Sequence, residues 1–296
     1  MFKRSRLKVQ QDDAQHVAAW ERGSVFSLLS RYGVLCVLAL LFLVPFYLLL
    51  RNAFLTQIQL FTRPWIWFPQ SLTLQSLQDV FQQDTVSMVD ALRNSLVIAV
   101  LTVVGQILFA SMGGYALARI PYRWRNQVFY AILLTLMIPG AVTFVPSFIV
   151  VSNLGWVNTL QGIVVPALFN GFYAILFRQF YLDFPKDLEE AARIDGVGYW
   201  GIYWRIVLPN AVTIHVALGL LAFIGAWNSF LWPLVIGQDS SLWTVQIAIA
   251  SFIQQQVINY PALFMAALLS LFPVLLIFFF AQRYIVAGIT RSGIRG

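Results

Sequence analysis

Long apolar runs, separated by short polar segments, dominate the pattern of residues along the chain. Uncharged runs extend over Tyr32–Leu50 and Asn94–Ala118, and a run over 126–177 is long enough for two membrane crossings. Further uncharged runs place crossings at roughly 206–232 and 262–282. About 20 apolar residues span the hydrocarbon core of a bilayer. The pattern therefore predicts an all-α membrane protein with six transmembrane helices.

Turn-forming residues indicate where these helices end. The segment 152–158 is predicted to separate the third and fourth crossings, and 236–261 is predicted to be a loop or a re-entrant helix. The first run is not expected to be a cleaved signal peptide, because Arg51 closes it and no small-residue cleavage site follows.

Composition narrows the class of protein. Hydrophobic residues make up 59% of the 296 residues and charged residues only 10%, whereas a soluble domain carries about 25% charged residues. The single cysteine and the two widely spaced histidines give no metal-ligand spacing, so no metal site is expected. None of the three lysines follows a glycine, so this chain is not expected to bind and hydrolyse ATP through a phosphate-binding loop.

The basic residues lie mainly on one side of the predicted spans. With the N-terminus inside, sixteen of the nineteen Lys and Arg residues fall in cytoplasmic segments, and the other three are Arg51, Arg63 and Arg93. This bias follows the positive-inside rule and explains the net charge of +7 without a nucleic-acid partner. Both termini are therefore expected in the cytoplasm.

The predicted membrane interior carries almost no ionisable groups. His215 is the only one there apart from tyrosines and Cys36, and it is expected to be a hydrogen-bonded residue of helix packing. Ion-coupled carriers place charged side chains at membrane depth. The absence of such charged side chains from the predicted spans argues against a secondary transporter, a voltage-gated channel and a membrane-embedded enzyme.

The segment 183–209, between the fourth and fifth crossings, carries the most specific pattern. Pro185 is placed to begin a short helix and Gly196 to end it with a left-handed cap. Leu188, Ala191 and Ala192 have the spacing of one helix face. Spacing alone leaves two interpretations open, a docking surface for another protein and an ordinary solvated loop.

Three stretches of the sequence resemble a known family. Glu190–Gly196 followed by Ile206–Pro209 resembles the EAA signature of ABC importer permeases, in its carbohydrate-group form. The tail 281–296 is similar to that of MalG-like subunits, and Ala226–Phe230 is similar to a fifth-span segment of sugar permeases, with Ser229 in place of its common acidic residue. The resemblance covers essentially residues 31–296 and implies the type I ABC importer permease fold with a cytoplasmic coupling helix.

The resemblance implies roles for particular residues. Those expected to couple to an ATPase are Glu190, Ala191, Ala192, Asp195, Gly196, Leu208 and Pro209, with tail contacts from Gly293, Ile294 and Gly296. Aromatic and amide side chains are the usual contacts of sugars, so the candidates for the substrate pathway are Asn170, Tyr173, Trp227, Asn228 and Trp232. For each of these five, helix packing remains the alternative.

The same resemblance implies the assembly. The chain would be the MalG-like permease subunit of a bacterial inner-membrane importer for an oligosaccharide or disaccharide. It would act with a MalF-like permease, a homodimeric ATPase that binds ATP and Mg²⁺, and an extracytoplasmic sugar-binding protein, in membrane lipid and without a cofactor of its own. Expected parts are a lead at 1–30, a permease domain at 31–286 and a tail at 287–296. A permease for a non-sugar solute is the first alternative, and an ion-coupled carrier the second.

Overall fold

The computed structural model describes residues 25–62, 65, 67–69, 71–83, 86–253 and 258–292. These residues form helices and connecting loops, with no β-strand among them. The chain divides into two compact units, and the boundary lies between Asn52 and Ala53. The long helix α2 (Val25–Ala53) makes up nearly all of the described part of the first unit. Most of the predicted lead at 1–30, and the tail residues Gly293, Ile294 and Gly296, lie outside the described residues.

The second unit contains the remaining helices. Along the chain they are α3 (Gln57–Phe61), α4 (Gln75–Phe81), α5 (Met88–Arg119), α6 (Arg125–Leu136), α7 (Gly140–Asn153), α8 (Leu160–Val164), η1 (Val165–Ala167), α9 (Gly171–Leu182), α10 (Lys186–Ile194), α11 (Tyr199–Ile202), η2 (Tyr203–Val207), α12 (Leu208–Asn210), α13 (Val212–Trp227), α14 (Leu231–Ile236), η3 (Ser240–Leu242), α15 (Val245–Ile253) and α16 (Tyr260–Ser292).

Helices long and apolar enough to cross a membrane occur in the predicted regions. Four are continuous or nearly so: Ser27–Ala53, Met88–Arg119, Leu160–Leu182 and Tyr260–Tyr284. Two bent pairs, α6 with α7 and the α11–α12 segment with α13, raise the number to six when each pair is one crossing. The prediction of six spans holds on this count, and the predicted break at 152–158 is confirmed by the end of α7 at Asn153.

The bends were not predicted in this form, and both occur beside proline. The axes of α6 and α7 differ by 101°, and Pro139 is the residue just before α7. Those of the α11–α12 segment and α13 differ by 79°, next to Pro209. Proline lacks the N–H that would continue the helix and restricts the residue before it. The fifth predicted span also ends early, because α13 stops at Trp227.

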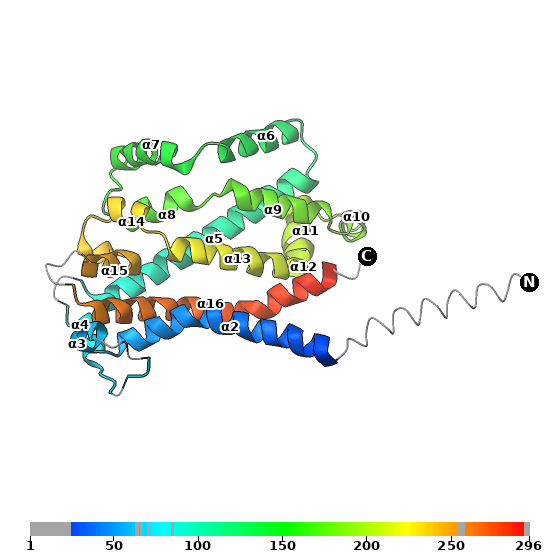
Figure 1. Ribbon diagram of the computed structural model, residues 1–296. Coiled ribbons are helices and arrows are strands. Elements are labelled where there is room, and N and C mark those ends of the chain that lie inside the picture. The colour runs from blue at the N-terminus through cyan, green and yellow to red at the C-terminus, as the bar shows by residue number, and fades with distance from the viewer. Residues whose placement is uncertain are drawn as a thin grey trace, which may run out of the picture. The chain divides into compact units, whose positions relative to one another are not determined.

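Helix α5 occupies a central place in the second unit. In Figure 1 it crosses behind α9 and α13, with α6 and α7 along one edge of this unit. The approach of α5 to α9 is especially close at Gly114, where an added Cβ would lie 2.6 Å from Cβ of Phe177 and 2.8 Å from the backbone nitrogen of Arg178. Only glycine permits this contact, so α5 and α9 are closely packed at Gly114.

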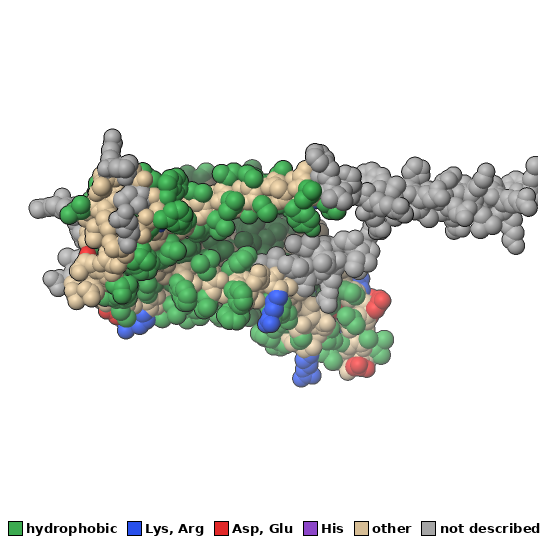
Figure 2. All heavy atoms as spheres, turned by 60° about the horizontal axis from the view of Figure 1, so that its bottom comes forward, with side chains coloured by type: hydrophobic (Ala, Val, Ile, Leu, Met, Phe, Trp, Pro, Cys, Tyr) green, Lys and Arg blue, Asp and Glu red, His purple; other side chains and the backbone are tan. Residues whose placement is uncertain are grey.

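Apolar side chains form separate buried clusters at the two ends of the unit. One lies at the end that carries α4, α15 and the start of α16 and includes Trp227 and Phe252. Another lies at the end that carries α10 and α11 and includes Phe177, Tyr181 and Tyr203. Hydrophobic side chains also cover much of the face shown in Figure 2, while charged side chains gather near its ends. This distribution is the one expected of a chain that crosses a membrane.

Candidate functional site

Helix α10 and the turn after it form a compact elbow, as predicted. The helix begins after Pro185 and ends at Ile194. Gly196 has φ +78°, the left-handed conformation. The N–H of Gly196 donates to the carbonyl of Arg193, and that of Val197 donates to the carbonyl of Ala192. These two bonds make a Schellman motif, so the predicted glycine cap is confirmed.

The two sides of α10 have different surroundings. Leu188, Glu190 and Ala191 are exposed, whereas Ala192 is buried in the cluster beneath the helix. Ala192 therefore does not share an exposed face with Leu188 and Ala191, because it is buried in the apolar cluster that also includes Phe177. The exposed part of the predicted docking face consists of the other residues, with Asp195 and Gly196 at its end.

Glu189, the neighbour of Glu190, is directed inward. Its Oε1 atom lies 3.2 Å from Nε of Arg119, the last residue of α5, and the two side chains are 3% and 6% exposed. The Nε and Oε1 atoms are not aligned for a hydrogen bond, so their attraction is mainly electrostatic. Oε2 of Glu189 also lies 3.7 Å from the guanidinium of Arg193. Burial raises the pKa of Glu189 and outweighs the two guanidinium groups, which lower that pKa.

The segment after the elbow is anchored by a buried polar cluster. The Oγ atom of Ser111 lies 2.6 Å from the hydroxyl of Tyr181, 2.9 Å from that of Tyr203 and 2.8 Å from Nε2 of His215. These four residues, here named the Ser111 cluster, come from α5, α9, η2 and α13. His215 is thus a hydrogen-bonded residue of helix packing, as expected. Of the predicted coupling residues that follow, Leu208 is half-buried and Pro209 is exposed.

A cavity of about 260 Å³ lies between α5, α9 and α13. Its lining residues are Ile98, Thr102, Gln106, Ile163, Ala167, Asn170, Tyr173, Ala222, Gly225, Ala226, Ser229, Trp232 and Pro233. None of them is charged. The cavity combines aromatic rings with amide and hydroxyl groups, which is the usual composition of a site for a neutral organic ligand.

Several polar groups of this cavity are held in place by the backbone. Nε2 of Gln106 donates to the carbonyl of Ala167 over 2.8 Å, and Nε1 of Trp232 donates to the carbonyl of Gly162 over 3.2 Å. Oδ1 of Asn170 accepts from the first turn of α9. Among the described residues, Oε1 of Gln106 and the hydroxyl of Tyr173 have no hydrogen-bond partner, so both are available to a ligand.

Three of the five predicted pathway residues therefore lie together at the cavity: Asn170, Tyr173 and Trp232. Trp227 does not line it, contrary to the expectation. Its ring is 2% exposed, stacks on Phe223 and donates to the carbonyl of Ser270. Asn228 is exposed outside the cavity, where its Oδ1 accepts from Gln246.

Sequence reasoning missed some lining residues. Thr102 and Gln106 face the cavity from α5, and Ser229 faces it from the segment after α13. A lone glutamine within an apolar span was the available signal, because an amide at membrane depth needs a polar partner. No group of three or more His, Cys, Asp or Glu residues that could hold a metal occurs among the described residues.

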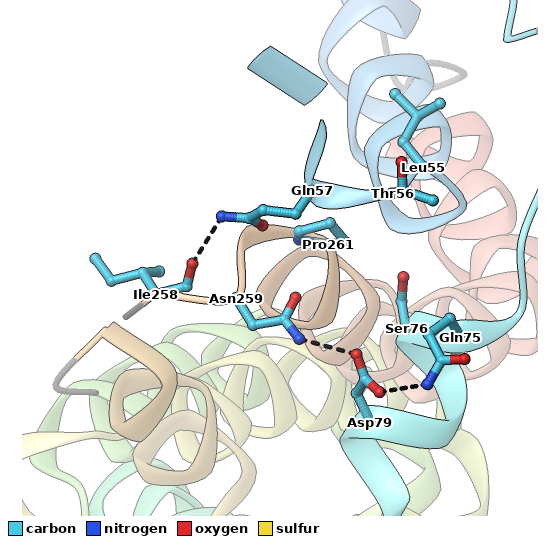
Figure 3. Close-up of a pocket in the computed structure, with 9 residues that line it drawn as sticks. All are labelled: Leu55, Thr56, Gln57, Gln75, Ser76, Asp79, Ile258, Asn259 and Pro261. Atoms are coloured by element: carbon cyan, nitrogen blue, oxygen red, sulfur yellow. Dashed lines mark hydrogen bonds between the residues drawn. The ribbon is translucent and has the colours of Figure 1, made fainter. Parts of the chain in front are cut away.

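A second cavity, of about 510 Å³, lies beside α3, α4 and the start of α16 (Figure 3). These elements are at the opposite end of the unit from α10 (Figure 1). Asp79 accepts there from the side-chain amides of Gln75 and Asn259, and Gln57 donates to the carbonyl of Ile258. These bonds tie α3 and α4 to the start of α16. Because several of the polar side chains bond to one another or to the backbone, they hold this loop region together.

The sequence has relatives of known family. Residues 106–291 match the family model described as the inner membrane component of binding-protein-dependent transport systems. An arabinooligosaccharide transport permease of Halalkalibacterium halodurans is 35% identical over 231 residues, 78% of this chain and 82% of that protein. An sn-glycerol-3-phosphate transport permease of Yersinia pestis is 32% identical over 265 residues, 88% of this chain and 94% of that protein.

The fold has a solved counterpart. A chain of a bacterial ABC transporter for import of the acidic polysaccharide alginate superposes with a TM-score of 0.77 at 20% identity, over 89% of this chain and 98% of that chain. The helices thus have the arrangement of a type I ABC importer permease. From this fold, the matched residues and the two relatives, we conclude that the chain belongs to the family of inner membrane components of binding-protein-dependent transport systems.

Proposed function

We propose that the chain is one of two permease subunits of an ATP-driven importer for a neutral oligosaccharide or disaccharide. The observation that carries the substrate class is the uncharged cavity between α5, α9 and α13. Phosphate and carboxylate ligands are typically bound by arginine or lysine, whereas hydroxyl-rich ligands are bound by amides, hydroxyls and aromatic faces. Of the two relatives, the arabinooligosaccharide permease therefore agrees better with this cavity than the sn-glycerol-3-phosphate permease does.

In the assembled importer this chain would form half of the pathway. A MalF-like permease would supply the other half, and an extracytoplasmic binding protein would deliver the sugar, in keeping with the family's dependence on such proteins. Asn170, Tyr173 and Trp232 would contact the sugar together with Gln106 and Ser229. Their free amide and hydroxyl groups would replace water around the sugar hydroxyls.

The elbow would be the docking point of a homodimeric cytosolic ATPase that binds ATP and Mg²⁺. The exposed Glu190 would pair with a basic group of that ATPase, and the small side chain of Ala191 would allow close approach. Asp195 and the turn at Gly196 would complete the docking surface, Ala192 would support it from beneath, and Leu208 and Pro209 would connect it to α13. The tail would reach the seam between the two ATPase subunits through Gly293, Ile294 and Gly296. In this proposal α10 and both termini would lie in the cytoplasm.

Uptake measurements test the substrate class. Cells that express the complete transporter would be given radiolabelled neutral arabinooligosaccharides or radiolabelled sn-glycerol-3-phosphate. We expect ATP-dependent uptake of the neutral sugar class, with competition by unlabelled neutral oligosaccharides and none by the phosphate ester. Uptake of sn-glycerol-3-phosphate alone would contradict the neutral-substrate assignment. A transporter with an inactivated ATPase provides the background.

The docking assignment needs a separate test. Glu190→Ala should weaken copurification of the ATPase and lower uptake about tenfold, since loss of one charge pair at an interface costs about 1.4 kcal/mol or more. Asp187→Ala removes another exposed acid from the same helix and serves as the matched control. Parental uptake by Glu190→Ala, or equal loss in both variants, would contradict the assignment.

A further inference from the structure

The buried pair of Arg119 and Glu189 joins α5 and α10, which are far apart in the sequence. Arg119 ends α5, whereas Glu189 lies in the middle of the elbow helix α10. Besides its 3.2 Å contact with Glu189, the Arg119 guanidinium donates from an Nη atom to the carbonyl of Phe184, in the turn that leads into α10. Arg119 therefore holds both the helix and the turn before it.

Stability alone does not account for this pair. Removing two charges from water is costly, and a buried pair is often no more stabilising than apolar residues of the same volume. The raised pKa of Glu189 has the same origin, because burial outweighs the attraction of Arg119 and Arg193. Glu190 and Lys186 act on Glu189 with smaller and opposite effects. A fixed geometry between α5 and α10 is what the pair does provide.

Helix α5 extends without interruption from this pair to the cavity. Its 32 residues contain no proline. Thr102 and Gln106 line the cavity from the same helix. At 1.5 Å per residue, the distance along the axis from Arg119 to Thr102 is about 25 Å. Between them, the Ser111 cluster and the close contact at Gly114 hold α5 against α9, η2 and α13.

We infer that Arg119 and Glu189 are positioning residues that transmit movement of the elbow to α5 and so to the wall of the substrate cavity. This inference rests on the proposed docking of an ATPase at α10. In it the two adjacent glutamates of α10 have separate tasks. Glu190 faces the ATPase, and Glu189 connects the helix to the span that carries Thr102 and Gln106. An elbow without this connection would still dock, but its movement would not be passed on to the cavity.

The test compares the complete transporter in proteoliposomes with variants of the pair. Glu189→Gln keeps the size of the side chain and removes the charge whose burial is costly, so it should assemble with the ATPase. We expect it to hydrolyse ATP while uptake per ATP falls about tenfold, within the range of coupling between distant sites. Double replacement with Arg119→Met and Glu189→Gln leaves no unpaired charge in the buried site. It should assemble with parental thermal stability and still show low uptake per ATP.

The outcomes separate transmission from folding and from docking. Parental uptake per ATP in either variant would overturn the inference. Failure of the double variant to assemble would overturn it as well, because the pair would then serve folding. The docking proposal fails by a different result, namely parental ATPase copurification and uptake in Glu190→Ala. Loss of uptake in Glu190→Ala accompanies loss of the bound ATPase, whereas loss of uptake in Glu189→Gln leaves the ATPase bound and active.

Discussion

Ser111 and His215 are hydrogen-bonded to each other over 2.8 Å, although 104 positions separate them in the chain. Nδ1 of His215 lies 2.7 Å from the carbonyl of Ala211, which can only accept, so Nδ1 carries the ring hydrogen. Nε2 is then an acceptor, and the Ser111 hydroxyl donates to it. The hydroxyls of Tyr181 and Tyr203 in turn donate to Oγ of Ser111, which has two lone pairs. Every group of the cluster is satisfied without a charge.

Replacement of Ser111 should therefore be costly. Ser111→Ala leaves the groups of three other helical segments without partners, so we expect the free energy of unfolding to fall by about 2 to 4 kcal/mol. Thermal unfolding of the purified protein in detergent measures the effect. Ser251→Ala is the matched control, because the one partner of that hydroxyl among the described residues is the carbonyl of Ala248, one turn earlier. Equal stability of the two variants would mean that the cluster is not a centre of helix packing.

The close contact at Gly114 predicts that two glycines of the spans differ in their tolerance of an added methyl group. Gly114→Ala forces a methyl group against Phe177 and the backbone of α9, and we expect a loss of about 1 to 3 kcal/mol of stability. Gly219→Ala is the control, since the nearest atom to an added Cβ there lies 4.0 Å away. That variant should be neutral or slightly stabilised. A Gly114→Ala protein as stable as the parent would refute the close packing of α5 on α9.

The cap of the elbow gives a third prediction. Gly196→Ala places a side chain at φ +78°, which costs about 1 to 2 kcal/mol for an L-residue. We expect loosening of the end of α10, seen as faster amide hydrogen exchange at 192–197 and lower uptake. Gly198→Ala changes a glycine two positions on, at φ −73° with open space around it, and should change neither. The same exchange rates in both variants would count against the Schellman cap.

Glu189 makes stability depend on pH in a definite direction. Because burial raises its pKa in the folded protein above the value in the unfolded chain, the folded form binds a proton more readily. Its contribution to stability is thus greatest below the ordinary carboxyl pKa of about 4.3 and is lost as pH rises through the raised value. As the pH rises from about 4 to about 7, the melting temperature of the parent should therefore fall relative to that of Glu189→Gln. A constant difference across this interval would contradict the raised pKa.

The cavity offers a prediction on ligand affinity. Tyr173→Phe removes only a hydroxyl that is free among the described residues, so it should leave folding and the maximal uptake rate unchanged. The sugar concentration for half-maximal uptake should rise about fivefold, as expected for one lost hydrogen bond. Asn228→Ala, which lies outside the cavity, should have no such effect. An unchanged half-maximal concentration in Tyr173→Phe would remove that hydroxyl from the pathway.

Local patterns allowed parts of this structure to be predicted. The apolar runs placed the spans, and the elbow followed from Pro185 and Gly196, because helix ends depend on the conformational limits of single residues. Glu189 and Glu190 show where such reasoning stops. They are adjacent and chemically identical, yet one is buried against Arg119 and the other is exposed. Which of them turns inward depends on how α10 is rotated against α5, and this rotation is set by tertiary contacts.

Long-range contacts account for the rest of what was missed. The partners of Ser111 lie 70 to 104 positions away, so no local pattern reveals the cluster. Trp227 and Trp232 are both tryptophans of apolar segments, but the break after α13 puts the first in the core and the second at the cavity. The bends beside Pro139 and Pro209 belong to the same class, because proline marks the place of a bend and packing sets its angle.

The continuity of α5 has a thermodynamic consequence. A single helix carries both one wall of the cavity and the attachment of the elbow, so on the proposed coupling the two sites share one free energy of interaction. Linkage is reciprocal: if docking of the ATPase alters sugar affinity by some factor, sugar must alter ATPase affinity by the same factor. The cavity would then report its occupancy to the cytosolic face, and the ATPase would bind a loaded permease and an empty one with different affinities.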